Sequence, residues 1–240
     1  MLTFDDFRKL ARDKSLKPYQ MAGFDPIYRE TTEANIFPDM RAKLPLLERR
    51  GKVVMDIGCG CTLPVQQLMA LCEAQGHTLV LVDSEEVLAN LPDRPFVHKM
   101  AHEFPRDAEF LQRWRQGVDV IICYSLLHML FPFQNVYSFC DHLVSLLRSG
   151  GQALIGDIPN ISKKRRYLSS ASGQQFHRQW SGSDEVPQID WQAQYDDIDD
   201  SVLLHLMLRY RSMGMETYLL PQPDGLALNH TREDLLICRR

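Results

Sequence analysis

The stretch 53–62 constrains this chain most, because an apolar run ends there in an acidic residue and passes into a loop punctuated by glycine. Asp56 closes the apolar run, and Gly58 and Gly60 stand in the loop. Glycine has no Cβ, so the backbone at both positions can adopt positive φ and come close to a bound molecule. Thr62 then has the character of a helix start. Strand, glycine loop and helix in this order predict a ligand-binding turn at the edge of an α/β sheet.

Asp56 narrows the class of ligand. A dinucleotide-binding loop of the Gly-x-Gly-x-x-Gly kind meets pyrophosphate with backbone amides, and a carboxylate just before its first glycines would repel that anion. Leu63 also replaces the last glycine of that pattern. The loop therefore predicts a ligand whose nearest end is neutral or cationic. With Asp56, Gly58 and Gly60 as the first members of a D-x-G-x-G-x-G motif, the chain resembles class I S-adenosylmethionine-dependent methyltransferases.

Short β-branched runs alternate with amphipathic stretches along most of the chain, which is typical of a parallel sheet covered by helices. Strands are expected at 52–57, 78–83, 95–98, 118–123, 151–157, 215–220 and 234–238. We predict an α/β fold, and the resemblance implies a Rossmann-like, seven-stranded, mostly parallel sheet with helices on both faces. The prediction is a single methyltransferase domain over 1–240, with an N-terminal helical cap over 1–50, a core from 51 onward and a lid inserted at about 159–199.

Composition excludes several classes of protein. No apolar run reaches the ~20 residues that a membrane span needs, and the first residues lack the features of a secretory signal, so we expect no membrane association and a cytoplasmic location. The six cysteines are scattered without CxxC pairs, which predicts no metal site. A net charge of -4 argues against a nucleic-acid partner. The oligomeric state stays open.

Polar residues also follow later strands. Asp83 ends the second strand, where a carboxylate can accept hydrogen bonds from the ribose hydroxyls of either NAD or S-adenosylmethionine. Asp83 therefore does not distinguish the two ligands, and the preference for S-adenosylmethionine rests on Asp56. Tyr124 and Ser125 follow the fourth strand, where the resemblance places the methyl-donor pocket. His102 is equally well read as an ordinary loop histidine. The resemblance implies S-adenosylmethionine as the cofactor, bound by Asp56, Gly58, Gly60, Thr62, Asp83, Ser84, Ala101, His102, Tyr124 and Ser125.

Two residues are candidates for catalysis. His128 stands at a spacing that the family commonly fills with histidine, and it is either a proton acceptor or a hydrogen-bonded core residue. Asp157 ends the fifth strand beside the expected donor pocket, and it either receives or orients an acceptor hydroxyl or anchors the loop before Pro159.

Candidates for acceptor binding come from the two regions outside the sheet. The aromatic N-terminal segment contributes Tyr19, Tyr28 and Arg29, with the alternative that its aromatic residues only anchor the segment. The basic run after the fifth strand contributes Asn160, Lys163 and Arg166, with the alternative of a solvated charged face. We predict methylation, on oxygen, of a small polar acceptor of an anionic or sugar-like kind. A catalytically silent S-adenosylmethionine-binding module and an RNA or protein methyltransferase stay open as alternatives.

Overall fold

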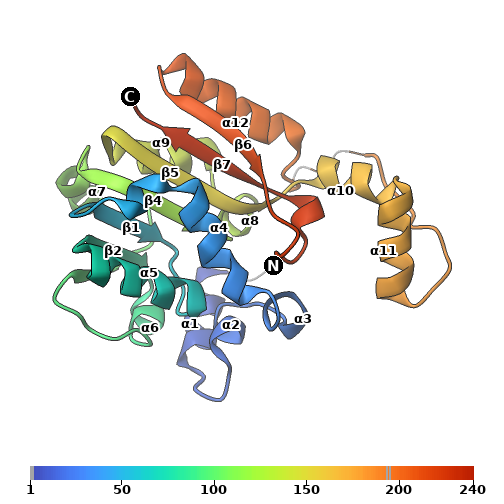
Figure 1. Cartoon of the computed structure of the whole chain (residues 1–240), viewed down its shortest axis with the longest axis horizontal. Coiled ribbons are helices and arrows are strands. Elements are labelled where there is room, and N and C mark those ends of the chain that lie inside the picture. Colours follow the sequence, from blue (N-terminus) through green and yellow to red (C-terminus); the bar gives the residue numbers. More distant parts are fainter. Residues whose placement is uncertain (1–2, 193, 195) are drawn as a thin grey trace.

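The computed structural model describes residues 3–192, 194 and 196–240. Its centre is one seven-stranded sheet with the order β3-β2-β1-β4-β5-β7-β6, in which β7 runs antiparallel to both of its neighbours (Figure 1). This confirms the predicted mostly parallel sheet closed by an antiparallel pair. The strands are β1 (Val53–Ile57), β2 (Thr78–Asp83), β3 (Val97–Ala101), β4 (Val118–Tyr124), β5 (Leu147–Pro159), β6 (Glu216–Pro221) and β7 (Arg232–Cys238).

Two strands, β3 and β5, depart most from their predicted bounds. β3 begins at Val97 and not at residue 95, because proline at position 95 has no N–H to donate to a ladder. β5 extends beyond the predicted 151–157 at both ends, since it pairs with β4 from Leu147 and with β7 up to Pro159.

Helices cover both faces of the sheet. The side chains of β1 alternate between the two cores, so that Val54 packs on one face and Met55 and Ile57 on the other. Buried side chains from α4 (Ile36–Lys43), α5 (Leu63–Gln75) and α6 (Glu85–Leu88) join the core of Val54. The opposite core holds buried side chains of α7 (Ala108–Trp114), α8 (Leu127–Leu130), α9 (Val136–Ser145) and α12 (Asp200–Ser212). No helix in the described part of the chain is long and apolar enough to cross a membrane.

Residues 3–50 form a cap of short helices. They are α1 (Phe4–Arg12), α2 (Pro18–Met21), α3 (Pro26–Arg29), the 3-10 turn η1 (Glu33–Asn35), α4 and the 3-10 turn η2 (Pro45–Glu48). Two prolines near the end of this segment have different effects. Pro38 does not break α4, because it lies in the first turn, where an N–H has no helical partner. Pro45 does end the helical run and starts η2.

The described residues between 160 and 199 form a segment that leaves the sheet after β5, and we call this segment the arm. It contains α10 (Ile161–Leu168) and α11 (Ala171–Ser181), and Figure 1 shows both helices standing away from the sheet. The two ends of the arm meet, because the Ile161 N–H donates to the Ile198 carbonyl at 2.9 Å. The remaining element, the 3-10 turn η3 (Asn229–Thr231), lies just before β7 and contacts α10.

Candidate functional site

A cavity of about 310 Å³ lies at the carboxyl ends of β1, β2 and β4, and we call it the donor cavity. Its floor is the glycine loop after β1, in which Gly58 and Gly60 have φ of 71° and 60°. A Cβ built on Gly60 would meet no atom within 4 Å, so the loop presents bare backbone to open space. The N-terminal cap closes the cavity from the other side with Phe4, Phe7, Met21, Phe24 and Arg29.

Two buried carboxylates face this cavity. Burial and repulsion by Asp83 raise the pKa of Asp56 to about 8. Burial raises the pKa of Asp83 to about 6, although its oxygens accept hydrogen bonds from the N–H groups of Gly60 at 3.0 Å and Ser84 at 2.7 Å. Among the described residues, neither carboxyl group forms an ion pair, and a positively charged ligand would favour the ionised form of both. The donor cavity therefore favours a cationic ligand over an anionic one.

Ser125 and Asp157 join the ends of β4 and β5. Each is a non-glycine residue with φ of 57°, and the Ser125 hydroxyl donates to the Asp157 carboxylate. Arg29 of the cap donates through Nη2 to Ser125 Oγ at 2.8 Å and lies 3.5 Å from Asp157 Oδ2. The guanidinium of Arg29 also stacks on the Phe24 ring, 3.9 Å from its centroid. The cap is thus fastened to the sheet edge at the wall of the donor cavity.

Asp157 has further partners on its other side. Gln222 donates to its Oδ1 at 3.4 Å, and Arg232 Nη1 lies 3.6 Å from its Oδ2 while donating to its carbonyl at 3.0 Å. The Asp157 N–H in turn donates to Asp234 at 2.7 Å. The Asp157 carboxylate is thus held by a hydroxyl, an amide and two guanidinium groups, and this fixed arrangement favours a positioning role.

His128 on α8 differs from Asp157 in its hydrogen bonding. Its Nδ1 is buried and has no hydrogen-bond partner among the described residues. Burial, together with the positive charge of Arg232, lowers the pKa of His128 to about 4. The ring is therefore neutral near pH 7 and has a nitrogen available to a ligand.

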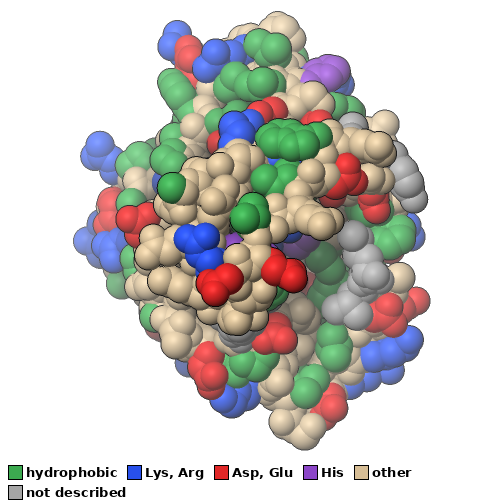
Figure 2. All heavy atoms as spheres, turned by 90° about the vertical axis from the view of Figure 1, so that its right-hand side faces the viewer, with side chains coloured by type: hydrophobic (Ala, Val, Ile, Leu, Met, Phe, Trp, Pro, Cys, Tyr) green, Lys and Arg blue, Asp and Glu red, His purple; other side chains and the backbone are tan. Residues whose placement is uncertain are grey.

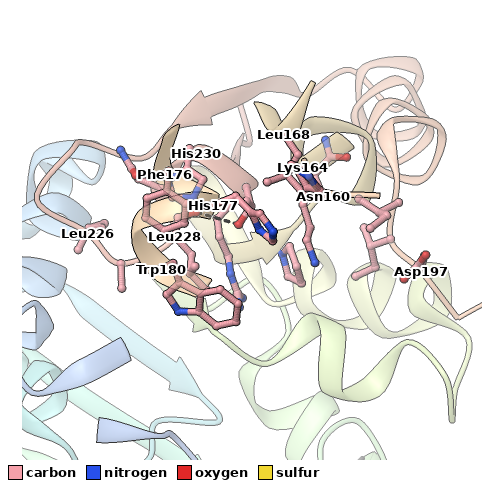
Figure 3. A pocket seen from close by; sticks show the side chains of 18 of the residues that line it. Asn160, Lys164, Leu168, Phe176, His177, Trp180, Asp197, Leu226, Leu228 and His230 are labelled. Carbon is pink, nitrogen blue, oxygen red and sulfur yellow. Dashed lines mark hydrogen bonds between the residues drawn. The ribbon is translucent and has the colours of Figure 1, made fainter. Parts of the chain in front are cut away.

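A second cavity, of about 1410 Å³, lies between the arm and the segment that joins β6 to β7, and we call it the acceptor cavity (Figure 3). Its walls include Phe176 and Trp180 of α11 and Leu226, Leu228 and His230 of the joining segment. His128 and Arg232 line both this cavity and the donor cavity. The two cavities therefore meet at these two side chains.

Eight of the ten residues predicted for donor binding lie in the wall of the donor cavity: Asp56, Gly58, Gly60, Thr62, Asp83, His102, Tyr124 and Ser125. Ser84 and Ala101 do not. Ser84 is buried with its hydroxyl committed to capping α6, where it accepts from the Val87 N–H at 3.3 Å, and Ala101 lies exposed at the end of β3. The capping hydrogen bond expected from the Thr62 side chain is also not formed.

The residues of the basic run that were predicted to bind the acceptor make hydrogen bonds or ion pairs within the protein. Asn160 lines the acceptor cavity, yet it is also buried, caps α10 and donates to Asp200 and Glu233. Lys163 donates to the carbonyls of Asn229 at 3.2 Å and Arg232 at 2.7 Å, because burial favours its pairing with protein groups. Arg166 pairs with Asp200 on the surface and lines neither cavity. The basic run thus anchors the arm, and within it Lys164 is the cation that lines the acceptor cavity.

The three N-terminal candidates for acceptor binding also differ in their outcomes. Tyr19 is buried in α2 and lines neither cavity, so a direct acceptor contact is not supported. The side chain of Tyr28 lies outside the part of the chain that the structure describes. Arg29 reaches the donor cavity and not the acceptor cavity.

Sequence reasoning missed two kinds of residue. Arg232 is far from every motif along the chain, and no local signal marks it. Glu33 of η1 lies near the start of α5, where contacts to the Thr62 hydroxyl and the Leu63 N–H oppose the rise in its pKa that burial causes. Thr62 stands where the glycine motif has its third glycine. This departure from the motif indicated that another group would contact the start of α5. Among the described residues, no group of three His, Cys, Asp or Glu side chains could hold a metal ion.

Comparison with solved structures places this geometry in a known fold. The chain matches the plantazolicin methyltransferase BpumL, solved in complex with a monoazolic desmethylPZN analog and SAH, at a TM-score of 0.58 and 14% identity, over 99% of this chain and 98% of that one. It matches a SAM-dependent methyltransferase from Archaeoglobus fulgidus at a TM-score of 0.55 and 14% identity, over 93% and 100%. The citrinin polyketide synthase CMeT domain matches at 0.51 and 12% identity over 79% of this chain, which spans only 46% of that one.

No protein-family model matches the sequence, and no curated protein matches it either. The solved structures therefore establish the fold, which is that of class I S-adenosylmethionine-dependent methyltransferases.

Proposed function

We propose that this chain is an S-adenosylmethionine-dependent methyltransferase that acts on a hydroxyl oxygen of a small polar acceptor. The observation that carries the proposal is the meeting of the two cavities at His128 and Arg232, with the buried carboxyl groups of Asp56 and Asp83 on the donor side. Donor and acceptor bound in these cavities would face one another across His128. Such alignment turns a reaction between two separate molecules into an effectively unimolecular step.

The chemistry of the donor cavity fits S-adenosylmethionine. When bound, this donor supplies a methyl group on a positively charged sulfur. Asp83 has lone pairs left for ribose hydroxyls, and the bare backbone of Gly60 permits close approach of a ligand. Tyr124 and Ser125 line the same cavity. An aromatic ring beside a cation is favourable, as are the negative charges of Asp56 and Asp83.

A dinucleotide fits this cavity less well. Its pyrophosphate would have to lie against the loop between Asp56 and Asp83, where burial already makes the ionised form of each carboxyl group costly, as the raised pKa values of both groups indicate. A second anion would raise that cost further.

His128 is the residue that we propose accepts the proton of the acceptor hydroxyl. Its ring is neutral, and its Nδ1 has no competing partner in the described structure. Arg232 opposes a positive charge on the ring, and the nearby Asp157 carboxylate offsets part of that effect. Asp157 itself would hold Arg29 and Arg232 in place. We therefore propose catalysis by His128 and positioning by Asp157.

The side chains around the acceptor cavity give little support to the anionic part of the acceptor prediction, and we retain only a small acceptor. Two of the three side chains on which the anionic prediction rested, those of Lys163 and Arg166, pair with protein groups. BpumL was solved with a monoazolic desmethylPZN analog, and that observation concerns BpumL alone. A cytoplasmic location remains a prediction from the sequence.

Calorimetry with S-adenosylmethionine, S-adenosylhomocysteine (SAH) and NAD tests the donor assignment. We expect both sulfur ligands to bind and NAD to show no saturable heat. Tight NAD binding without the other two would overturn the assignment. Binding of both sulfur ligands with no turnover of any acceptor in a broad screen would favour a silent binding module. Turnover of RNA or protein alone would show that the acceptor is a macromolecule and not a small molecule.

A further inference from the structure

The acceptor cavity has an apolar wall that the arm leaves exposed. Trp180 and Val186 line it with exposed fractions of 60% and 62%, unusually high values for large apolar side chains that face a cavity. Figure 2, which looks onto the side where the arm projects, shows hydrophobic and acidic side chains together on this face. Such a surface is stabilised when an apolar group covers it.

Ring side chains give this wall a fixed shape. His230 lies between Tyr167, 4.0 Å away, and Phe176, 4.7 Å away, as measured between ring centroids. Trp180 follows Phe176 by four residues on α11, so the two rings share one face of the helix, as Figure 3 shows. Phe176 is fixed by its neighbours, whereas Trp180 has no ring partner in the described structure. The wall can therefore receive a flat ring beside Trp180.

The charges around the cavity are unbalanced. Asp224 accepts a hydrogen bond from Asn229, and Arg232 is held by Asp157. This leaves the carboxylates of Glu185, Asp196 and Asp197 against the single ammonium of Lys164, and none of the four forms an ion pair with another described residue. An anion would be repelled from this rim, whereas a cation would be attracted to it.

We propose that the acceptor is a flat-ringed hydroxyl compound that carries a cationic amine, with its ring against Trp180 and its amine toward Glu185 and Asp197. This inference rests on the proposed function, because it names the substrate class of the same site. Ring and amine together would hold the hydroxyl toward His128, where the two cavities meet.

Three phenols that share one ring and differ in charge test the proposal. They are tyramine, which is cationic, 4-hydroxyphenylethanol, which is neutral, and 4-hydroxyphenylacetate, which is anionic. Each is titrated by ligand-observed NMR against the full chain saturated with SAH. We expect tyramine to bind at least about fivefold more tightly than 4-hydroxyphenylacetate, with the neutral phenol between them and the difference reduced by added salt.

Charge variants with a matched control locate the effect. The double variant Glu185→Gln/Asp197→Asn removes two carboxylates from the cavity, and Asp184→Asn/Asp190→Asn removes two from the same loop that line neither cavity. The first should abolish most of the preference for tyramine, and the second should leave it unchanged. An equal loss in both variants would overturn the proposed contact, as would wild-type protein that prefers the anion or shows no preference.

Ring variants test the other half of the proposal. Trp180→Ala should weaken all three phenols by a similar factor of at least about threefold, because the ring contact does not depend on the charge of the ligand. Trp191→Ala is the control, since Trp191 is 63% exposed in the same arm but lines neither cavity. SAH binding is measured first and separately. Its absence counts against the proposed function, whereas SAH binding without tyramine binding counts against the acceptor class alone.

Discussion

The donor cavity and the acceptor cavity differ in how the chain builds them. The donor cavity is formed mainly where β1, β2 and β4 end, so its residues follow directly after apolar runs that are visible in the sequence. The acceptor cavity is formed by the arm and by the segment before β7, which meet although more than forty residues separate α11 from that segment. Strand ends thus give a reliable guide to a site, whereas a run of charge outside the sheet does not.

His128 lies at the boundary of the two cavities, and its replacement has the largest expected effect. His128→Gln removes the proposed proton acceptor, so turnover should fall by about 100-fold or more with SAH affinity unchanged. The measurement is the initial rate of SAH formation with the acceptor that the wild-type protein uses best. His142→Gln, on the exposed side of α9, is the control. Equal losses of turnover and SAH affinity would identify His128 as structural.

Asp83 tests the donor side alone. Asp83→Asn should weaken SAH binding by about 1–3 kcal/mol, because the amide cannot accept from both Gly60 and Ser84 and makes a weaker hydrogen bond to ribose. Calorimetry measures the change, and Asp93→Asn, an exposed carboxylate that lines neither cavity, is the matched control. Unchanged affinity would remove the ribose-binding role of Asp83, and weaker phenol binding would show that the two cavities are not independent.

Asp56 gives the donor side a dependence on pH. Its pKa is raised from 3.8 to about 8, so the folded chain binds this proton more tightly than the unfolded chain does. The free energy of unfolding of the ligand-free protein should therefore fall as the pH rises through that window. Asp56→Asn should flatten the fall, and each 1 kcal/mol of difference corresponds to about 2–4 °C in melting temperature for a chain of this size. If the free energy of unfolding of the two proteins depended on pH in the same way, the ionisation of Asp56 would carry no energetic cost in the folded chain.

Arg166 has the smallest expected effect. Its ion pair with Asp200 is largely exposed, so Arg166→Gln should change the free energy of unfolding by less than about 1 kcal/mol and leave acceptor affinity unchanged. Lys164→Gln is the comparison, because Lys164 lines the acceptor cavity. Chemical denaturation and phenol titration measure the two effects. A larger change in phenol affinity for Arg166→Gln than for Lys164→Gln would restore the basic run as the acceptor site.

The difference between the cavities also explains which predictions succeeded. The order of strands and the wall of the donor cavity follow from local patterns, since Asp56 and Asp83 need only the strand that precedes each of them. The roles of Asn160 and Lys163 depend on Glu233 and on the Asn229 and Arg232 carbonyls, which are 66 to 73 residues away along the chain. No local pattern encodes those partners. A buried cation that donates to carbonyls is indistinguishable in sequence from a solvated one.

The hydrogen bond between Ile161 and Ile198 makes the arm a closed excursion from the sheet. A chain that leaves and re-enters a fold at one point can be cut there and rejoined by a short turn without separating the strands on either side. Under the proposed function, a different segment grafted between these two residues would change the preferred acceptor while the donor cavity is kept.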